Sequence, residues 1–88
     1  MARAPLSVFG RVVWVMMAVW GIRSYASLSA LLRDHGHEFK SDTLRNWLTG
    51  RTSVHHTFPP ALVEALRLDE GERARLADAF TYRQDERP

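Results

Sequence analysis

The spacing of apolar positions along the chain predicts five short helices and almost no strand. The first helix covers about residues 6–20 and contains an unbroken apolar run, VVWVMMAVW, at residues 12–20. In the four segments that follow, apolar residues recur at intervals of three and four, which places them on one helix face. The residues expected to be buried there are Tyr25, Leu28, Leu31 and Leu32; Leu44, Trp47 and Leu48; Leu62, Ala65 and Leu66; and Leu76, Ala77 and Phe80.

The residues between these segments favour helix ends. Ser24 and Ser41 are expected N-caps, because a serine hydroxyl accepts hydrogen bonds from the first N–H groups of a helix. Asp69 followed by Glu72 has the spacing of a capping box at the start of the fifth helix. The remaining expected signals are Gly21, Gly36 and Gly50 as helix ends and Pro60 at the start of a fourth helix that runs to Leu68.

Length and composition place these helices in one domain. The chain has 88 residues, 45% of them hydrophobic, with only five Gly and four Pro, which is typical of a globular protein. We therefore expect a single all-α domain over residues 1–88, folded as a compact five-helix bundle with a frayed tail over about 84–88. The absence of cysteine excludes a disulfide framework and fits a cytoplasmic protein.

Charge is distributed unevenly along the chain. Residues 1–60 contain seven Lys or Arg and three Asp or Glu, a net charge of +4, whereas residues 61–88 contain five and seven, a net charge of −2. A basic region on a small domain is the electrostatic pattern expected of a protein that binds nucleic acid.

The third predicted helix, SDTLRNWLTG at residues 41–50, has an outward face without apolar residues. One interpretation is a helix face that only contacts solvent. The other is a face that reads DNA, because Asn pairs with adenine, Asp accepts from the cytosine amino group, Thr meets the thymine methyl, and Arg and Lys bind phosphates or guanine. The outward residues are Asp42, Thr43, Arg45, Asn46 and Thr49.

Residues 24–68 resemble the helix-turn-helix domain of the Cro and phage-repressor type, a lambda-repressor-like fold of five helices. The resemblance rests on three motifs in order along the chain: a Ser-x-x-x-Leu opening, a Thr-Leu-x-x-Trp-x-x-Gly signature, and a Pro-led helix followed by Ala-Leu-x-Leu-Asp-Glu-x-Glu-Arg. Their residues are Ser24 and Leu28; Thr43, Leu44, Trp47 and Gly50; and Pro60 with residues 65–73. The resemblance implies a central helix-turn-helix over about residues 24–50.

In that family, the third helix reads base edges in the major groove, while helix ends and loops contact the DNA backbone. For Asp42, the alternative to a base contact is a cap on the helix. The positions that the resemblance assigns to bases are Ser41, Asp42 and Asn46, with Thr43 close by, and those assigned mostly to phosphates are Lys40, Arg45, Thr49 and Arg51.

These features predict a sequence-specific regulator of transcription, of bacterial or phage type, that binds double-stranded DNA and has no ligand-sensing domain. The alternative is a helical protein-binding module, such as an adaptor, phage inhibitor or antitoxin, that uses the same fold. No catalytic constellation is recognisable, so we expect neither an enzyme nor a cofactor or small-molecule ligand. His35, His37, His55 and His56 lack the spacing of a metal site, and the last two are expected to contact DNA or solvent.

The apolar run in the first helix is too short to cross a membrane, which takes roughly 20 residues. A helical wheel places Phe9, Val12, Val13, Met16, Met17 and Trp20 on one broad face that faces the core. Trp14, Val15 and Ala18, with Val19 at the margin, point the other way. Either the fifth helix covers these residues, or they form the interface of a homodimer, and we predict the homodimer.

Overall fold

The computed structural model describes residues 6–85, with side chains up to residue 81, and every regular element in this range is an α-helix. The prediction of an all-α domain of five helices is confirmed. The helices are α1 (Val8–Val19), α2 (Tyr25–Asp34), α3 (Ser41–Leu48), α4 (Phe58–Leu66) and α5 (Glu70–Asp85).

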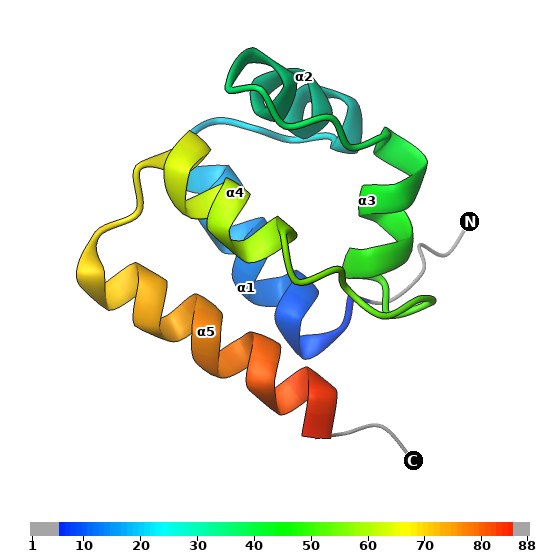
Figure 1. The fold of residues 1–88 in the computed structure, drawn as a ribbon, viewed down its shortest axis with the longest axis vertical. Helices are drawn as coiled ribbons and strands as arrows, with labels where there is room; N and C mark the ends of the chain where they lie inside the picture. The colour runs from blue at the N-terminus through cyan, green and yellow to red at the C-terminus, as the bar shows by residue number, and fades with distance from the viewer. Residues whose placement is uncertain (1–5, 86–88) are drawn as a thin grey trace.

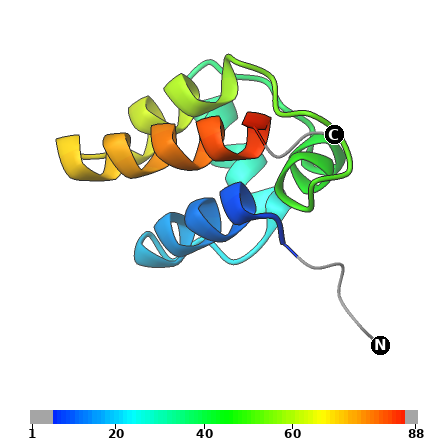
Figure 2. The same cartoon turned by 90° about the horizontal axis from the view of Figure 1, so that it is seen from below.

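The long helix α5 packs along α1 in the opposite direction, with α4 against α5, while α2 and α3 close the other side of the molecule (Figures 1 and 2). Phe9 of α1 lies at the centre of this arrangement, with its ring 6.0 Å from that of Phe58 and 5.9 Å from that of Phe80. The largest fully buried side chains come from all five helices: Phe9, Val13, Met17, Leu28, Leu32, Leu44, Leu48, Phe58, Leu62, Leu66 and Leu76.

Several predicted helix ends are confirmed. The Ser24 hydroxyl accepts a hydrogen bond of 3.1 Å from the Ser27 N–H at the start of α2. Asp69 and Glu72 form the reciprocal capping box, with the Glu72 N–H 2.8 Å from Asp69 Oδ1 and the Asp69 N–H 3.0 Å from Glu72 Oε1. Gly21, Gly36 and Gly50 all have positive φ, a conformation that favours glycine after a helix.

Other predicted ends are wrong. Ser41 is the first residue of α3 and not its N-cap; Lys40 occupies the cap position and provides no side-chain hydrogen bond. The helix α4 begins at Phe58 rather than Pro60, because Pro59 and Pro60 both fit a first turn that needs no N–H donors. It ends at Leu66, two residues before the predicted Leu68, because Arg67 has a left-handed conformation with φ of 49°.

The face of α5 and the ends of the chain also differ from the prediction. Ala77 is exposed, and Ala79 joins Leu76 in the core instead, with Phe80 half-buried. The expected frayed tail is wrong for residues 84 and 85, which continue α5, while residues 86–88 lie outside the described range. The first helix spans Val8–Val19 instead of about 6–20.

Candidate nucleic-acid interface

A close backbone contact with α1 fixes the end of α3. The Ser7 N–H and hydroxyl both donate to the Leu48 carbonyl, at 2.9 and 3.1 Å, and the same hydroxyl accepts from the Gly10 N–H at 2.9 Å. A Cβ atom at Gly10 would collide with the Leu48 carbonyl oxygen, so glycine is required there. The signals for this contact were a serine ahead of the first apolar run and an isolated glycine inside a helical pattern.

The inner face of α3 is anchored in a cluster of aromatic rings. Leu44, Trp47 and Leu48 are buried, as predicted. The Trp47 ring lies 5.4 Å from that of Phe39, in the turn before α3, and 5.1 Å from that of Phe58, the first residue of α4. The turn is held from α2, because the buried Ser29 hydroxyl donates to the Phe39 carbonyl at 2.6 Å. This anchoring fixes which side chains α3 presents outward.

The outer face of α3, as the structure places it, consists of Asp42, Arg45, Asn46 and Thr49. These residues lie opposite Leu44 and Trp47 on the helix. Among the residues predicted to contact DNA, the exposed ones are Lys40, Asp42, Arg45 and Arg51, and the half-buried ones are Ser41, Thr43, Asn46 and Thr49. Ser41 lies at the flank of this face rather than at its centre, because a helix turns by about 100° per residue.

Two members of the outer face have internal contacts. The Arg45 guanidinium lies over the ring of Tyr25, with 5.7 Å between its carbon and the ring centroid, which links α3 to the first residue of α2. The Thr49 hydroxyl donates to the Arg45 carbonyl at 2.7 Å. Arg45 is therefore oriented, whereas the hydroxyl hydrogen of Thr49 is already used within the helix.

Asp42 does not cap α3, so that interpretation of the residue is wrong. Its carboxylate is exposed, and the helix has no side-chain hydrogen bond at its N-terminal cap. Among the described side chains, no hydrogen bond or ion pair is formed by those of Lys40, Asp42, Asn46 and Arg51. The free carboxylate sits in the first turn of α3, where the helix dipole favours negative charge.

The histidines have structural contacts that the sequence pattern did not predict. His37, after α2, forms a 2.6 Å contact between its Nε2 and Glu64 Oε1 of α4. His55 lies ahead of α4, where its Nδ1 accepts from the Thr57 N–H at 3.3 Å, and its ring stacks on that of His56. Residues 37 and 64 are far apart in sequence, so no local spacing signals their contact. No cluster of three potential metal ligands occurs among the residues described.

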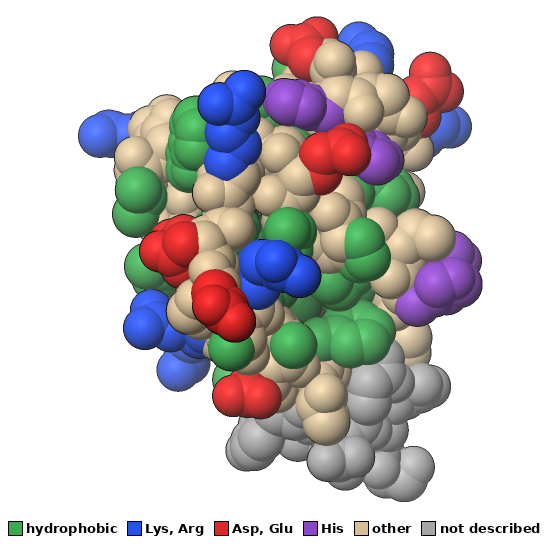
Figure 3. Space-filling model, turned by 60° about the vertical axis from the view of Figure 1, so that its left-hand side comes forward, with side chains coloured by type: hydrophobic (Ala, Val, Ile, Leu, Met, Phe, Trp, Pro, Cys, Tyr) green, Lys and Arg blue, Asp and Glu red, His purple; other side chains and the backbone are tan. Residues whose placement is uncertain are grey.

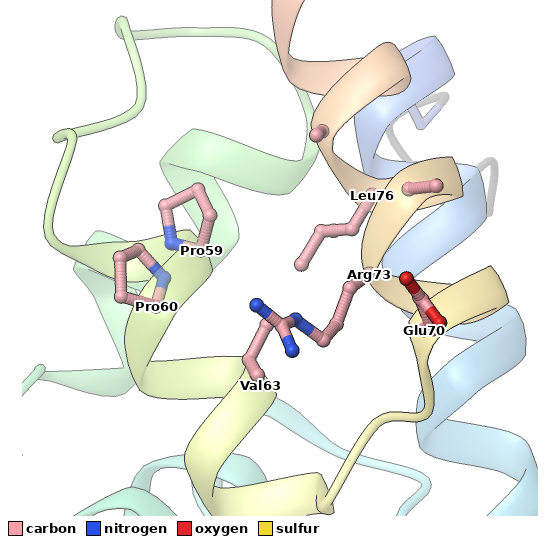
Figure 4. Close-up of a pocket in the computed structure, with 8 residues that line it drawn as sticks. Pro59, Pro60, Val63, Glu70, Arg73 and Leu76 are labelled. Atoms are coloured by element: carbon pink, nitrogen blue, oxygen red, sulfur yellow. The ribbon is translucent and has the colours of Figure 1, made fainter.

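A shallow open groove lies between α4 and α5, on the side of the molecule away from α3. Figure 3 shows that this side carries charged side chains of both signs around a small apolar area. The Arg73 guanidinium extends from α5 toward Val63 of α4 (Figure 4). The groove is lined by Pro59, Pro60, Val63, Glu70, Arg73, Ala74, Leu76 and Ala77.

The residues predicted to form a dimer interface are placed differently by the structure. Trp14 is half-buried, and its ring lies 5.3 Å from that of Tyr25, so it packs within the chain and not outward. Val15 and Ala18 are exposed, as expected. Trp20, expected in the core, is 49% exposed because α1 ends at Val19 and the chain turns there. Within the described part of the chain, no helix is long and apolar enough to cross a membrane.

Comparisons of this chain with protein-family models, with curated proteins and with solved structures gave no match.

Proposed function

We propose that this protein is a transcriptional regulator that binds double-stranded DNA in a sequence-dependent manner, with α2 and α3 as a helix-turn-helix and α3 in the major groove. The observation that carries the proposal is the outer face of α3. Asp42 and Asn46 offer hydrogen-bonding groups that no described side chain uses, on a helix held firmly by its inner face. Such groups read base edges.

The cations around α3 suit the DNA backbone. Lys40 precedes the helix, Arg51 follows it, and both are exposed without an ion pair among the described residues. Arg45 is oriented by Tyr25 beside the same face. The acidic first turn of α5, with Glu70 and Glu72, lies on the opposite side of the molecule (Figure 1). Phosphates can therefore approach α3 without meeting that acidic turn.

The second candidate is a protein-binding module of the same fold, such as an adaptor or antitoxin. The observation that favours it is a set of exposed valines on α1, because exposed apolar surface marks protein contacts. Binding of duplex DNA distinguishes the two candidates, since only a DNA-binding protein releases counterions from phosphates when it binds.

The test is a titration of labelled duplex DNA at several salt concentrations. The logarithm of the affinity falls with the logarithm of salt by about 0.9 for each phosphate neutralised, so three cations give a slope of about −2.7 per protomer. Arg51→Ala should make that slope shallower by about 1. The matched control is Arg73→Ala on α5, which should leave the slope unchanged. No binding of duplex DNA at low salt would reject the proposal in favour of the protein-binding module.

A further inference from the structure

The large hydrophobic side chains that are exposed in the described chain are concentrated on one helix. Val8, Val15 and Val19 of α1 are 39%, 59% and 73% exposed, and Trp20, directly after the helix, is 49% exposed. Scattered exposed apolar residues are ordinary on a protein surface, but a contiguous set marks an interaction site. We define the α1 outer face as Val8, Arg11, Val15, Ala18 and Val19, all of which are exposed.

The fold leaves this face uncovered. The opposite face of α1 is buried through Phe9, Val13, Met16 and Met17. The helices α4 and α5 lie on that buried side, and α1 forms the outer layer of the molecule (Figure 2). From α2, the ring of Tyr25 contacts Trp14 at the edge of the face. The alternative that α5 covers these valines is therefore wrong.

We propose that the α1 outer face binds the same face of a second copy of this chain, with the two helices antiparallel about Val15. The face is self-complementary, because Arg11 is its only charged residue. In a parallel pair, Arg11 would lie against Arg11 of the partner. In an antiparallel pair centred on Val15, each Val15 lies beside its own copy, Arg11 lies beside Ala18 of the partner, and Val12 lies beside Val19. Each Arg11 side chain can then extend past the edge of the pair to solvent.

The size of the face limits the area that the pair can bury. A helix of 12 residues is about 18 Å long, so an interface centred on α1 falls in the small class, below about 1,200 Å² in total. Interfaces of that size associate weakly and reversibly. The expected dissociation constant is in the micromolar range, so monomer and dimer exchange within a single concentration series.

Sedimentation of the protein alone tests the proposal without reference to DNA, so its outcome is independent of the proposed function. Wild type should sediment increasingly as a dimer as its concentration rises. Val15→Glu should raise the dissociation constant by at least about tenfold, because the two carboxylates would be desolvated beside each other at the two-fold axis. Ala30→Glu, at an exposed position of α2, is the matched control and should dimerise like wild type. A wild type that stays monomeric up to about 500 μM would overturn the proposal.

Cysteine cross-linking tests the antiparallel arrangement, because the chain has no cysteine of its own. Val15→Cys should form an intermolecular disulfide readily on mild oxidation, since residue 15 lies beside its own copy at the two-fold axis. The two copies of residue 8 lie about 21 Å apart along such a pair, so Val8→Cys should cross-link far less. More disulfide from Val8→Cys than from Val15→Cys would overturn the antiparallel pairing, and no disulfide from either would overturn the dimer.

Discussion

Gly10 lies where α1 crosses the end of α3, and its lack of a side chain allows the two backbones to touch. In an ordinary helix, Gly→Ala would stabilise the protein by about 0.5–1 kcal/mol. Here the new Cβ meets a backbone carbonyl that cannot rotate away, so we expect Gly10→Ala to lower the free energy of unfolding by about 3 kcal/mol, at the upper end of overpacking costs. Urea denaturation followed by circular dichroism measures the change.

Gly71→Ala is the control for that substitution. Gly71 lies in the first turn of α5, and the nearest atom to an added Cβ is Asp69 Oδ1 at an ordinary 3.5 Å. Gly71→Ala should therefore leave the free energy of unfolding unchanged or raise it by up to about 1 kcal/mol. If both substitutions shift the unfolding midpoint equally, the contact between Gly10 and Leu48 is not what holds α3 in place.

Trp14 and Trp20 show where the helical wheel fails for single residues. The wheel assigned Trp20 to the core and Trp14 to the outside. Trp20 is exposed because α1 ends one residue before it. Trp14 is half-buried because its ring packs against that of Tyr25 in α2. A helical wheel describes one regular helix. It shows neither where that helix ends nor which other helices pack against it.

The capping box at the start of α5 makes a prediction at the scale of the element. Asp69→Ala removes the acceptor of the Glu72 N–H and should lower the free energy of unfolding by about 1 kcal/mol. Asp78→Ala, at an exposed position in the middle of α5, should change it by less than about 0.5 kcal/mol. Thermal unfolding of the two variants provides the comparison, and equal midpoints would contradict a stabilising role for the cap.

Helix starts and ends were predictable where one local residue determines them. Ser24, Asp69 and the glycines after α1, α2 and α3 act through their own hydrogen bonds or backbone angles, so their signals are present in the sequence. The end of α4 was not predictable, because Arg67 adopts a left-handed angle that an arginine only rarely takes. The N-cap of α3, Lys40, provides no side-chain hydrogen bond, so no residue signalled that the helix starts at Ser41.

At the scale of the whole molecule, the sequence predicted that there are five helices but not how they cover one another. The polar outer face of α3 followed from its spacing of Leu44, Trp47 and Leu48. The wheel also placed Val15, Ala18 and Val19 on the exposed face of α1, but it could not show that Trp14 packs inward, since that depends on where α2 lies. The contact between His37 and Glu64 was hidden for the same reason, because the turn after α2 must pack against α4 before these side chains become neighbours.

The proposed dimer also bears on how the molecule would meet DNA. Ser7 ties the end of α3 to the start of α1 and lies eight residues before Val15. Those residues span about 12 Å, so an axis at Val15 places the two Ser7 residues about 24 Å apart along the helix pair, with each α3 beyond them. This arrangement suits two inverted half-sites about one helical turn of DNA apart, or about 34 Å.

Selection of bound duplexes from random DNA tests the central claim, sequence-dependent binding through α3, most directly. Wild type should return a reproducible motif, and selection with Asn46→Ala should return the same motif with one position relaxed, since a bidentate contact contributes about 1–3 kcal/mol of base discrimination. Wild type that enriches no sequence would contradict the account, as would an Asn46→Ala protein that selects the wild-type motif with undiminished preference at every position.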